Sequence, residues 1–432
     1  MNETTLHATK TALITLANDV IRMLSESGRA IEAFRGIAIY DTAKDAVITA
    51  LPSFGPASSA IRAMPLVEER YGTESADRLA LQWVYELLPR LADASFIASA
   101  EALWADFMVE LNEPQWIFRG VANLRHFSDS APGVVLGPID GVTIQGRSFD
   151  QLASLGFDQF IIDALIEDWS GFGASSYVVV AEKRVDKARD NLVLSSDGSP
   201  WVNAIRLLSA MRLVAPGDIS MGQMWLVRPV RFNVGIGGHS HTLWSIPAPP
   251  AGATYEVPPS LAPRIEQQYA NLLHLAEPGY GQGPGNLDLA LRSFMATYDR
   301  WPIQADSQLI DSITAAEAVI GTETEITFRL AFRMAGLLAA NASEREEVFK
   351  AMKSFYDVRS KLVHGGALKP KHTALLKDVS VLRSYVRRLL AAFVTLAVSG
   401  STQYDRKFFA ERLDLVLQDE EGRRRLRSDL GL

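Results

Sequence analysis

The strongest constraint on the fold is a charged residue within the apolar face of a predicted helix. Ser343 and Glu346 have the spacing of a capping box, and Gly365-Gly366 provides a left-handed stop, so we expect a helix over about 344–364. Arg359 falls in the row of apolar side chains that recur mostly every three or four residues. That row consists of Val348, Met352, Phe355, Tyr356, Leu362 and Val363. Because burying an unpaired charge is costly, Arg359 is predicted either to pair with a carboxylate or to face a partner.

His364 stands at the predicted C-terminal end of the same helix, where the macrodipole favours a positive charge by roughly 0.3 to 1 kcal/mol. Imidazole is the side chain that can both take and give protons near neutral pH. Between positions 350 and 390, ten basic residues stand against only Asp357 and Asp378. This local excess predicts a phosphate site around Arg359 and His364, or alternatively a solvated helical face.

The composition is that of an ordinary globular protein. A chain of 432 residues with 48% hydrophobic and 22% charged residues is long enough for two or three domains. Its net charge of -7 argues against indiscriminate coating of nucleic acid, and the lack of cysteine excludes disulfides and thiolate chemistry. The N-terminus has no basic region followed by an apolar core, and the longest apolar stretch, 389–398, is about half a membrane span. We therefore expect a cytoplasmic protein without a membrane segment.

Hydrophobic periodicity divides the chain into five parts. Residues 1–112 are predicted to be helical, and 113–250 to mix strands with helices. Residues 251–285 are rich in proline and glycine, which predicts a linker with a short helix. Residues 286–400 are predicted to form a helical bundle, and 401–432 a charged C-terminal helix. The expected fold class is α+β, predominantly α.

Other motifs point to no cofactor or metal. The glycines of 235–238 and 279–285 lack the spacing of a phosphate-binding loop and are predicted to be turns. His239-Ser240-His241 offers two imidazoles, which is half of a metal site, but no third ligand is indicated. The sequence also contains no Gly-x-Ser-x-Gly elbow. We therefore expect no cofactor and no bound metal.

The C-terminal region resembles a known family in both motif and helix order. Arg359-Ser360 followed by Val363-His364-Gly365 is similar to the Arg-x4-His signature of the HEPN superfamily, and in particular to its ApeA-like branch. Residues 306–320 resemble the first family helix, with Glu317 near its end, and 325–338 resemble the second. The similarity covers 287–398, about a quarter of the chain.

The resemblance implies a metal-independent endoribonuclease that leaves a 2',3'-cyclic phosphate and a 5'-hydroxyl, used as a toxin or an anti-phage defence effector. Arg359 and His364 would be its catalytic residues, with Glu317 orienting Arg359 and Ser360 touching phosphate. Family members generally pair two such domains, so the single motif implies a homodimer whose axis passes near Arg359 and His364. The basic residues expected to bind RNA are Lys353, Lys361, Lys369 and Lys371.

Two alternatives remain open. A non-catalytic HEPN module would bind RNA or a protein partner and would use Arg359 structurally. An antitoxin that accepts nucleotidyl groups is also conceivable, although such antitoxins are usually short chains. By fold-level analogy with effector proteins, residues 1 to about 260 are expected to sense a trigger, and no residue pattern identifies it.

Overall fold

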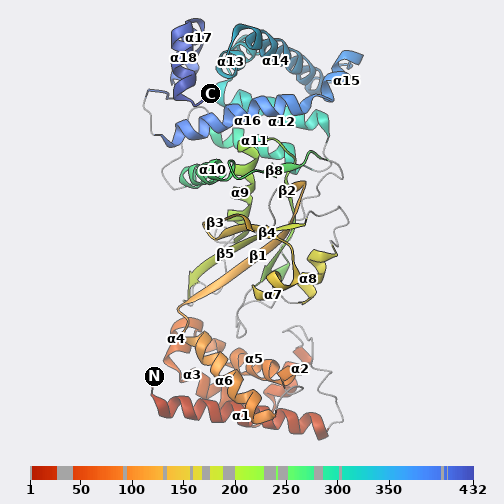
Figure 1. The fold of residues 1–432 in the computed structure, drawn as a ribbon. Coiled ribbons are helices and arrows are strands. Elements are labelled where there is room, and N and C mark those ends of the chain that lie inside the picture. The colour runs from red at the N-terminus through yellow and green to blue at the C-terminus, as the bar shows by residue number, and fades with distance from the viewer. Residues whose placement is uncertain are drawn as a thin grey trace.

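The computed structural model stacks three layers along one long axis, with the N-terminal helices at one end, a sheet in the middle and a larger helical assembly at the other end (Figure 1). The prediction of an α+β, predominantly α fold is confirmed. The structure describes residues 2–26, 42–90, 95–129, 134–155, 159–167, 176–187, 200–227, 240–241, 252–276, 286–300, 304–399, 403–405 and 407–432.

The N-terminal layer is a set of amphipathic helices around one apolar core. In α5, the apolar residues spaced at three and four positions all lie in this core, as the helical period predicts. Trp116 and Phe118 from the first strand of the sheet enter the same core, and Trp116 meets Tyr71 edge to face at 5.8 Å. The first strand thereby ties the two layers together. The helices are α1 (Glu3–Glu26), α2 (Thr42–Thr49), α3 (Phe54–Arg62), α4 (Pro65–Tyr71), the 3-10 turn η2 (Thr73–Ser75), α5 (Ala76–Arg90) and α6 (Phe96–Asn112).

The middle layer is an antiparallel sheet with strand order β3-β4-β5-β1-β6-β7. Alternate residues of β5 enter different cores: Val178 and Val180 pack under α7 and α8, whereas Val179 and Ala181 pack under α9 and α10. Since both faces are covered, β5 has a continuous apolar run. The elements are β1 (Gln115–Arg125), β3 (Val134–Ile139), β4 (Val142–Gly146), α7 (Phe149–Ser154), α8 (Gln159–Ile166), β5 (Tyr177–Asp186), α9 (Pro200–Val214), β6 (Ser220–Val227) and β7 (Ser240–His241).

The segment 251–285, predicted to be a linker with a short helix, forms that helix and a strand within its described part, 252–276, and both belong to the middle layer. The strand β8 (Tyr255–Val257) pairs in parallel with β2 (Phe127–Asp129). The helix α10 (Ala262–Leu275) buries Ile265 and Tyr269 in the same core as α9. Its prolines fit this role, because Pro263 lies in the first turn of α10, where no backbone N–H is needed.

The third layer is the helical bundle that the sequence predicts over 286–400. The helix α12 lies centrally, in contact with α11, α14 and α16, while α13 packs along α14. The C-terminal segment forms two helices and a π-helical turn rather than one helix, and its apolar residues enter the bundle core. The elements are α11 (Leu287–Asp299), α12 (Ala305–Ile320), α13 (Ile326–Leu338), α14 (Ala342–Val363), α15 (Pro370–Leu376), α16 (Val379–Val398), η5 (Phe408–Arg412), α17 (Leu413–Gln418) and α18 (Glu420–Asp429).

A cluster of arginines around one tyrosine joins the middle layer to the bundle. The Tyr298 ring of α11 lies between two guanidinium groups, with Arg212 of α9 at 4.5 Å and Arg383 of α16 at 4.0 Å. Arg212 donates two hydrogen bonds to Asp299, at 2.7 and 2.9 Å, and Arg383 donates one to Asp218 at 2.8 Å. Because these contacts link α9 to α11 and α16, the bundle and the sheet are held in a defined orientation.

Replacing Asp299 with alanine is expected to destabilise the protein by roughly 2 kcal/mol, because it leaves the Arg212 guanidinium, with its side chain 3% exposed, without its carboxylate. The measurement is the urea midpoint of unfolding followed by circular dichroism. Asp288→Ala is the matched control, since its ion pair with Arg292 on the same helix is 79% and 70% exposed. Equal midpoints for the two variants would contradict the role of the cluster.

Candidate functional site at the end of helix α14

The helix that carries Arg359 begins earlier than its sequence signals predict. Asn341 is the N-cap of α14, and its side chain accepts a hydrogen bond from the Glu344 N–H at 3.0 Å. The Glu344 carboxylate accepts one from the Ala340 N–H at 2.7 Å. The predicted capping box of Ser343 and Glu346 is therefore wrong, because Asn341 caps as well as serine does and the earlier start gains further helical hydrogen bonds.

The C-terminal end of α14 follows the glycine signal. Gly365 has φ of 71°, in the left-handed region, and the Gly366 N–H donates to the Lys361 carbonyl at 2.8 Å. This is the six-to-one hydrogen bond of a Schellman motif. His364 is the C-cap, and its backbone N–H donates to the Ser360 carbonyl at 3.0 Å. The predicted stop at Gly365 is confirmed.

Arg359 lies beside the carboxylate that the resemblance named. Its Nη2 is 3.4 Å from Oε2 of Glu317, and the Tyr356 hydroxyl donates to Oε1 of the same carboxylate at 3.0 Å. The Arg359 guanidinium is also 5.6 Å from the centre of the Tyr356 ring. The three side chains form one group between α12 and α14, so Arg359 has a carboxylate neighbour, one of the two outcomes that its position in the apolar row requires.

The contact between Arg359 and Glu317 leaves the guanidinium only partly satisfied. The two side chains are 23% and 22% exposed, so solvent screens their attraction, and 3.4 Å is long for a charged hydrogen bond. The Arg359 Nε is buried without a hydrogen-bond partner among the described residues. Burial, with the Glu317 charge second, raises the pKa of Tyr356, which keeps its hydroxyl protonated as the donor. The guanidinium therefore has one long contact to a carboxylate and a buried Nε without a hydrogen bond among the described residues.

His364 is exposed, and its side chain has no hydrogen bond or ion pair within the described part of the chain. Helical geometry separates it from Arg359 by about 7.5 Å along the axis and about 140° around it. The two residues thus share the last turns of α14, but the structure shows no contact between their side chains. Ser360, which directly follows Arg359 in the sequence, is half-buried.

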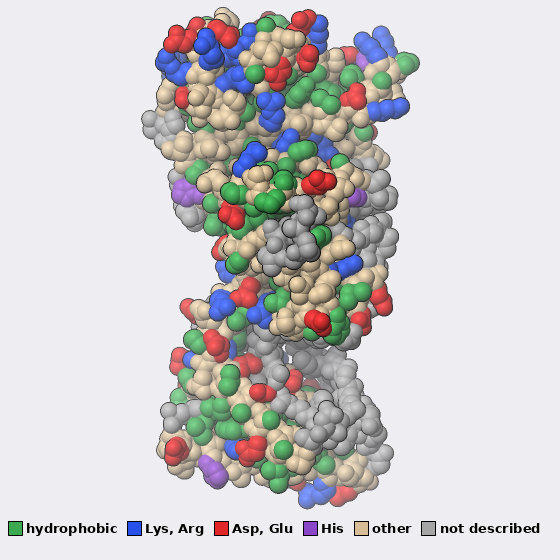
Figure 2. Space-filling model, in the orientation of Figure 1, with side chains coloured by type: hydrophobic (Ala, Val, Ile, Leu, Met, Phe, Trp, Pro, Cys, Tyr) green, Lys and Arg blue, Asp and Glu red, His purple; other side chains and the backbone are tan. Residues whose placement is uncertain are grey.

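The basic residues around the motif separate into an accessible group and a structural group. Lys353, Lys369 and Lys371 are exposed, and Figure 2 shows basic side chains over the projecting corner at α15. Lys361 forms an ion pair with Asp357. By contrast, Arg383 faces Asp218 and Arg388 donates to the Leu338 carbonyl, so these two stabilise the fold. Of the predicted RNA-binding residues, Lys353, Lys369 and Lys371 are exposed on the surface, and the Lys353 ammonium lies 5.6 Å from the centre of the Phe349 ring.

His372 is a site residue that sequence reasoning missed. It is 1% exposed, its Nδ1 accepts a hydrogen bond from the Lys369 N–H at 3.0 Å, and its Nε2 lies 3.0 Å from an oxygen of Asp357 on α14. A hydrogen bond from Lys361 is the main cause that lowers the pKa of Asp357. His372 thus caps the start of α15 and lies buried close to Asp357 of α14, although its Nε2 forms no hydrogen bond among the described residues. The signal was present, because Pro370 marks the first position of a helix whose third position is His372.

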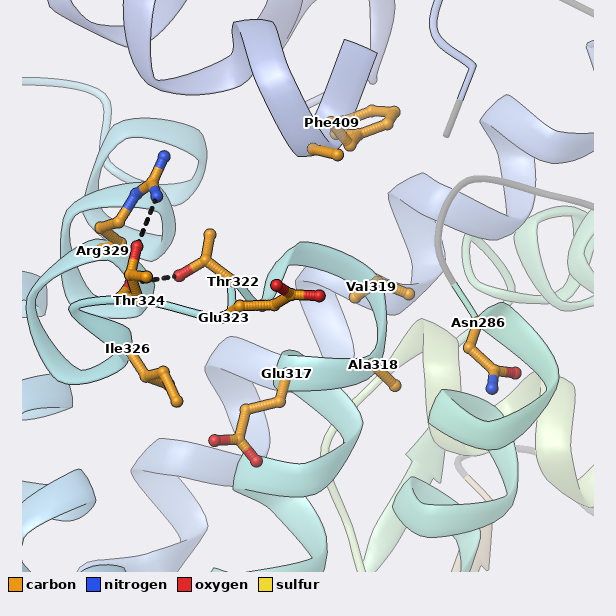
Figure 3. A pocket seen from close by; sticks show the side chains of 12 residues that line it. Asn286, Glu317, Ala318, Val319, Thr322, Glu323, Thr324, Ile326, Arg329 and Phe409 are labelled. Carbon is orange, nitrogen blue, oxygen red and sulfur yellow. Dashed lines mark hydrogen bonds between the residues drawn. The ribbon is translucent and has the colours of Figure 1, made fainter. Parts of the chain in front are cut away.

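A pocket of about 700 Å³ opens on the other side of Glu317 (Figure 3). It lies between the end of α12, the turn that leads to α13, the start of α11 and the turn η5. Glu317 therefore belongs both to this pocket and to the group around Arg359. The lining residues are Asn286, Glu317, Ala318, Val319, Gly321, Thr322, Glu323, Thr324, Ile326, Arg329, Phe409 and Ala410.

The described residues contain neither a cluster of metal ligands nor a helix that could span a membrane. No group of three or more His, Asp or Glu side chains there is arranged to hold a metal ion, and His239 of the His239-Ser240-His241 pair lies outside the described residues. None of the described helices has the length and apolar character needed to cross a bilayer. Comparison of the chain with protein-family models, curated proteins and solved structures finds no match.

Proposed function

We propose that this protein is a metal-independent endoribonuclease that acts as a homodimer, with Arg359 and His364 at the cleavage site. One observation carries the proposal: the last turns of α14 hold an exposed imidazole and an incompletely paired guanidinium. These are a group that transfers protons near neutral pH and a cation that suits phosphate oxygens. The HEPN-like motif and helix order support the same assignment.

The reaction requires one proton acceptor and one proton donor. The imidazole of one His364 takes the proton of the RNA 2'-hydroxyl, whose oxygen then attacks the adjacent phosphorus. The bond from phosphorus to the 5'-oxygen breaks, and His364 of the second copy gives that oxygen a proton. The products are a 2',3'-cyclic phosphate and a 5'-hydroxyl, and the protons balance because one imidazole gains the 2'-hydroxyl proton while the other loses one to the 5'-oxygen.

Arg359 would stabilise the negative charge that builds on the phosphate oxygens during this attack. Its present neighbour, Glu317, holds the guanidinium at one end through a 3.4 Å contact and leaves Nε free of hydrogen bonds among the described residues. The exposed side chains of Lys353, Lys369 and Lys371 would attract the RNA backbone. A second copy of the chain supplies the second imidazole, since each copy carries one Arg359-x4-His364 motif.

A non-catalytic role is the second candidate, and the group of Arg359, Glu317 and Tyr356 favours it. In that case the arginine pairs with Glu317 to hold α14 against α12, and the surface lysines bind RNA without cleaving it. The two candidates differ in whether His364 matters, because its side chain has no structural contact in the described residues.

The test is to incubate the purified full chain with labelled single-stranded RNA, with and without chelator. We expect cleavage that persists in chelator, products that end in a 2',3'-cyclic phosphate, and a dimer in sedimentation velocity. Binding without cleavage would establish the non-catalytic role, and cleavage that is lost in chelator would contradict the proposed chemistry.

A further inference from the structure

The pocket beside Glu317 has an excess of hydrogen-bond acceptors. Two carboxylates line it, Glu317 and Glu323, together with the hydroxyl groups of Thr322 and Thr324. Its lining arginine, Arg329, is ion-paired with Asp414 at 2.5 Å, a carboxylate that it shares with Arg333. Glu317 is likewise shared with Arg359. The Glu323 side chain is exposed and has no ion pair or hydrogen bond in the described structure, so its carboxylate is available to the N–H donors of a ligand.

The size and the apolar walls of the pocket suit an organic group better than a bare ion. A volume of about 700 Å³ lies within the range of small-molecule sites. Val319, Ile326 and Phe409 provide apolar walls on separate elements, and Figure 3 shows Glu323 lying between Phe409 and Glu317. A ligand with a flat apolar face and an edge of N–H donors would use both properties.

Among the nucleobases, guanine matches a free carboxylate best. Its Watson–Crick edge presents two adjacent donors, N1–H and N2–H, which can bond both oxygens of one carboxylate. Adenine and cytosine place a ring acceptor next to their amino group, and uracil flanks its single N–H with two carbonyls. Those acceptors would face the negative oxygens of Glu323 and repel them.

We infer that this pocket binds a guanine base through the Glu323 carboxylate. The base could come from an RNA strand or from a free guanine nucleotide, and the first source rests on the proposed function. Glu317 is the structural link for that source, because one of its carboxylate oxygens is 3.4 Å from Arg359 while the residue also lines the pocket. A strand with its phosphate at Arg359 would therefore have a neighbouring base within reach of the pocket.

The experiment is a calorimetric titration of the full chain with guanosine, adenosine, cytidine and uridine. We expect guanosine to bind at least tenfold more tightly than the other three, as one bidentate contact provides. Glu323→Gln should remove this preference. Glu325→Gln is the matched control, since Glu325 is an exposed carboxylate two residues away that does not line the pocket. Methyl NMR should show a guanosine-dependent shift at Ile326 in the wild type.

Several outcomes would overturn the inference: equal affinity for the four nucleosides, an unchanged preference in Glu323→Gln, or no response at Ile326.

To separate the sources, binding of guanosine monophosphate is compared with that of a 2'-O-methyl RNA containing a single guanine, and with the same RNA carrying adenine there. Dependence on the guanine of the strand identifies RNA, and tight binding of the mononucleotide alone identifies a free nucleotide. Guanosine binding without RNA cleavage would contradict only the proposed nuclease function. Cleavage with no preference for guanine would contradict only the proposed guanine site in the pocket.

Discussion

Replacing His364 with alanine is expected to lower the rate of RNA cleavage by about 100-fold or more, because a proton-transfer group typically contributes 10²–10⁴-fold. In a homodimer the same substitution removes the imidazole from both copies and therefore both the base and the acid. RNA binding should change little, since Arg359 and the surface lysines remain. The measurement is the single-turnover rate on a labelled RNA, together with its dissociation constant.

The structure supplies a matched control for this variant. His7 is an exposed histidine on α1, at the opposite end of the molecule, and His7→Ala should cleave at the wild-type rate (Figure 1). His364→Ala is not expected to destabilise the fold, because the His364 side chain is exposed and has no described contact to lose. Equal rates for His364→Ala and wild type would remove the catalytic role and leave the non-catalytic module.

Replacing Asp414 with alanine is expected to destabilise the bundle by about 3–5 kcal/mol, because it leaves a buried charge without its partner. Asp414 receives hydrogen bonds from Arg333, at 2.6 and 3.1 Å, and from Arg329, at 2.8 and 2.5 Å. The Arg333 side chain is 1% exposed, so water cannot replace the lost carboxylate. The measurement is the urea midpoint at pH 7.

The ion pairs of Asp414 also make the stability difference between wild type and Asp414→Ala depend on pH. Burial alone would raise the pKa of Asp414, but the hydrogen bonds and charges of Arg333 and Arg329 outweigh it and lower the pKa below 3.8. A carboxyl whose pKa is lower in the folded state stabilises the fold above its unfolded pKa, and this contribution is lost as the pH falls through the folded value. The difference in stability between wild type and Asp414→Ala should therefore narrow below about pH 3.8.

An exposed pair on the neighbouring helix serves as the control for Asp414. Glu421 and Arg425 of α18 are 77% and 68% exposed, and Glu421→Ala should change stability by less than about 1 kcal/mol. A loss in Asp414→Ala no larger than that of Glu421→Ala would show that the buried arginines find other partners.

Much of the helical framework was predictable, because local periodicity and end signals specify it. The apolar row of α14, the buried stripe of α5 and the stop at Gly365 all follow from spacing and from the freedom of glycine at positive φ. The start of α14 was misplaced by competing caps, Asn341 and Ser343, which offer similar local hydrogen bonds. The short helix predicted within the proline-rich segment forms as α10, with Pro263 in its first turn, but its burial against α9 in the middle layer was not predicted.

The partners of the buried charges were not predictable in the same way. Arg333 and Asp414 are 81 positions apart, and Arg212 and Asp299 are 87 apart. Neither pair has a spacing that a helix or hairpin imposes. The run of basic residues from 350 to 390 likewise looked uniform, but packing turns Arg383 and Arg388 inward and leaves Lys353, Lys369 and Lys371 on the surface.

The sequence by itself determined which parts of the chain are helical and where most described strands form, and that Arg359 and His364 lie near the end of one helix. These properties depend on residues within a few positions of one another. Only the tertiary structure decided that Tyr356 donates to the Glu317 carboxylate beside Arg359, that His372 is buried close to Asp357, and that Glu317 also lines a pocket. The reason is physical: such contacts depend on how distant elements pack together, and residue spacing along the chain does not specify that packing.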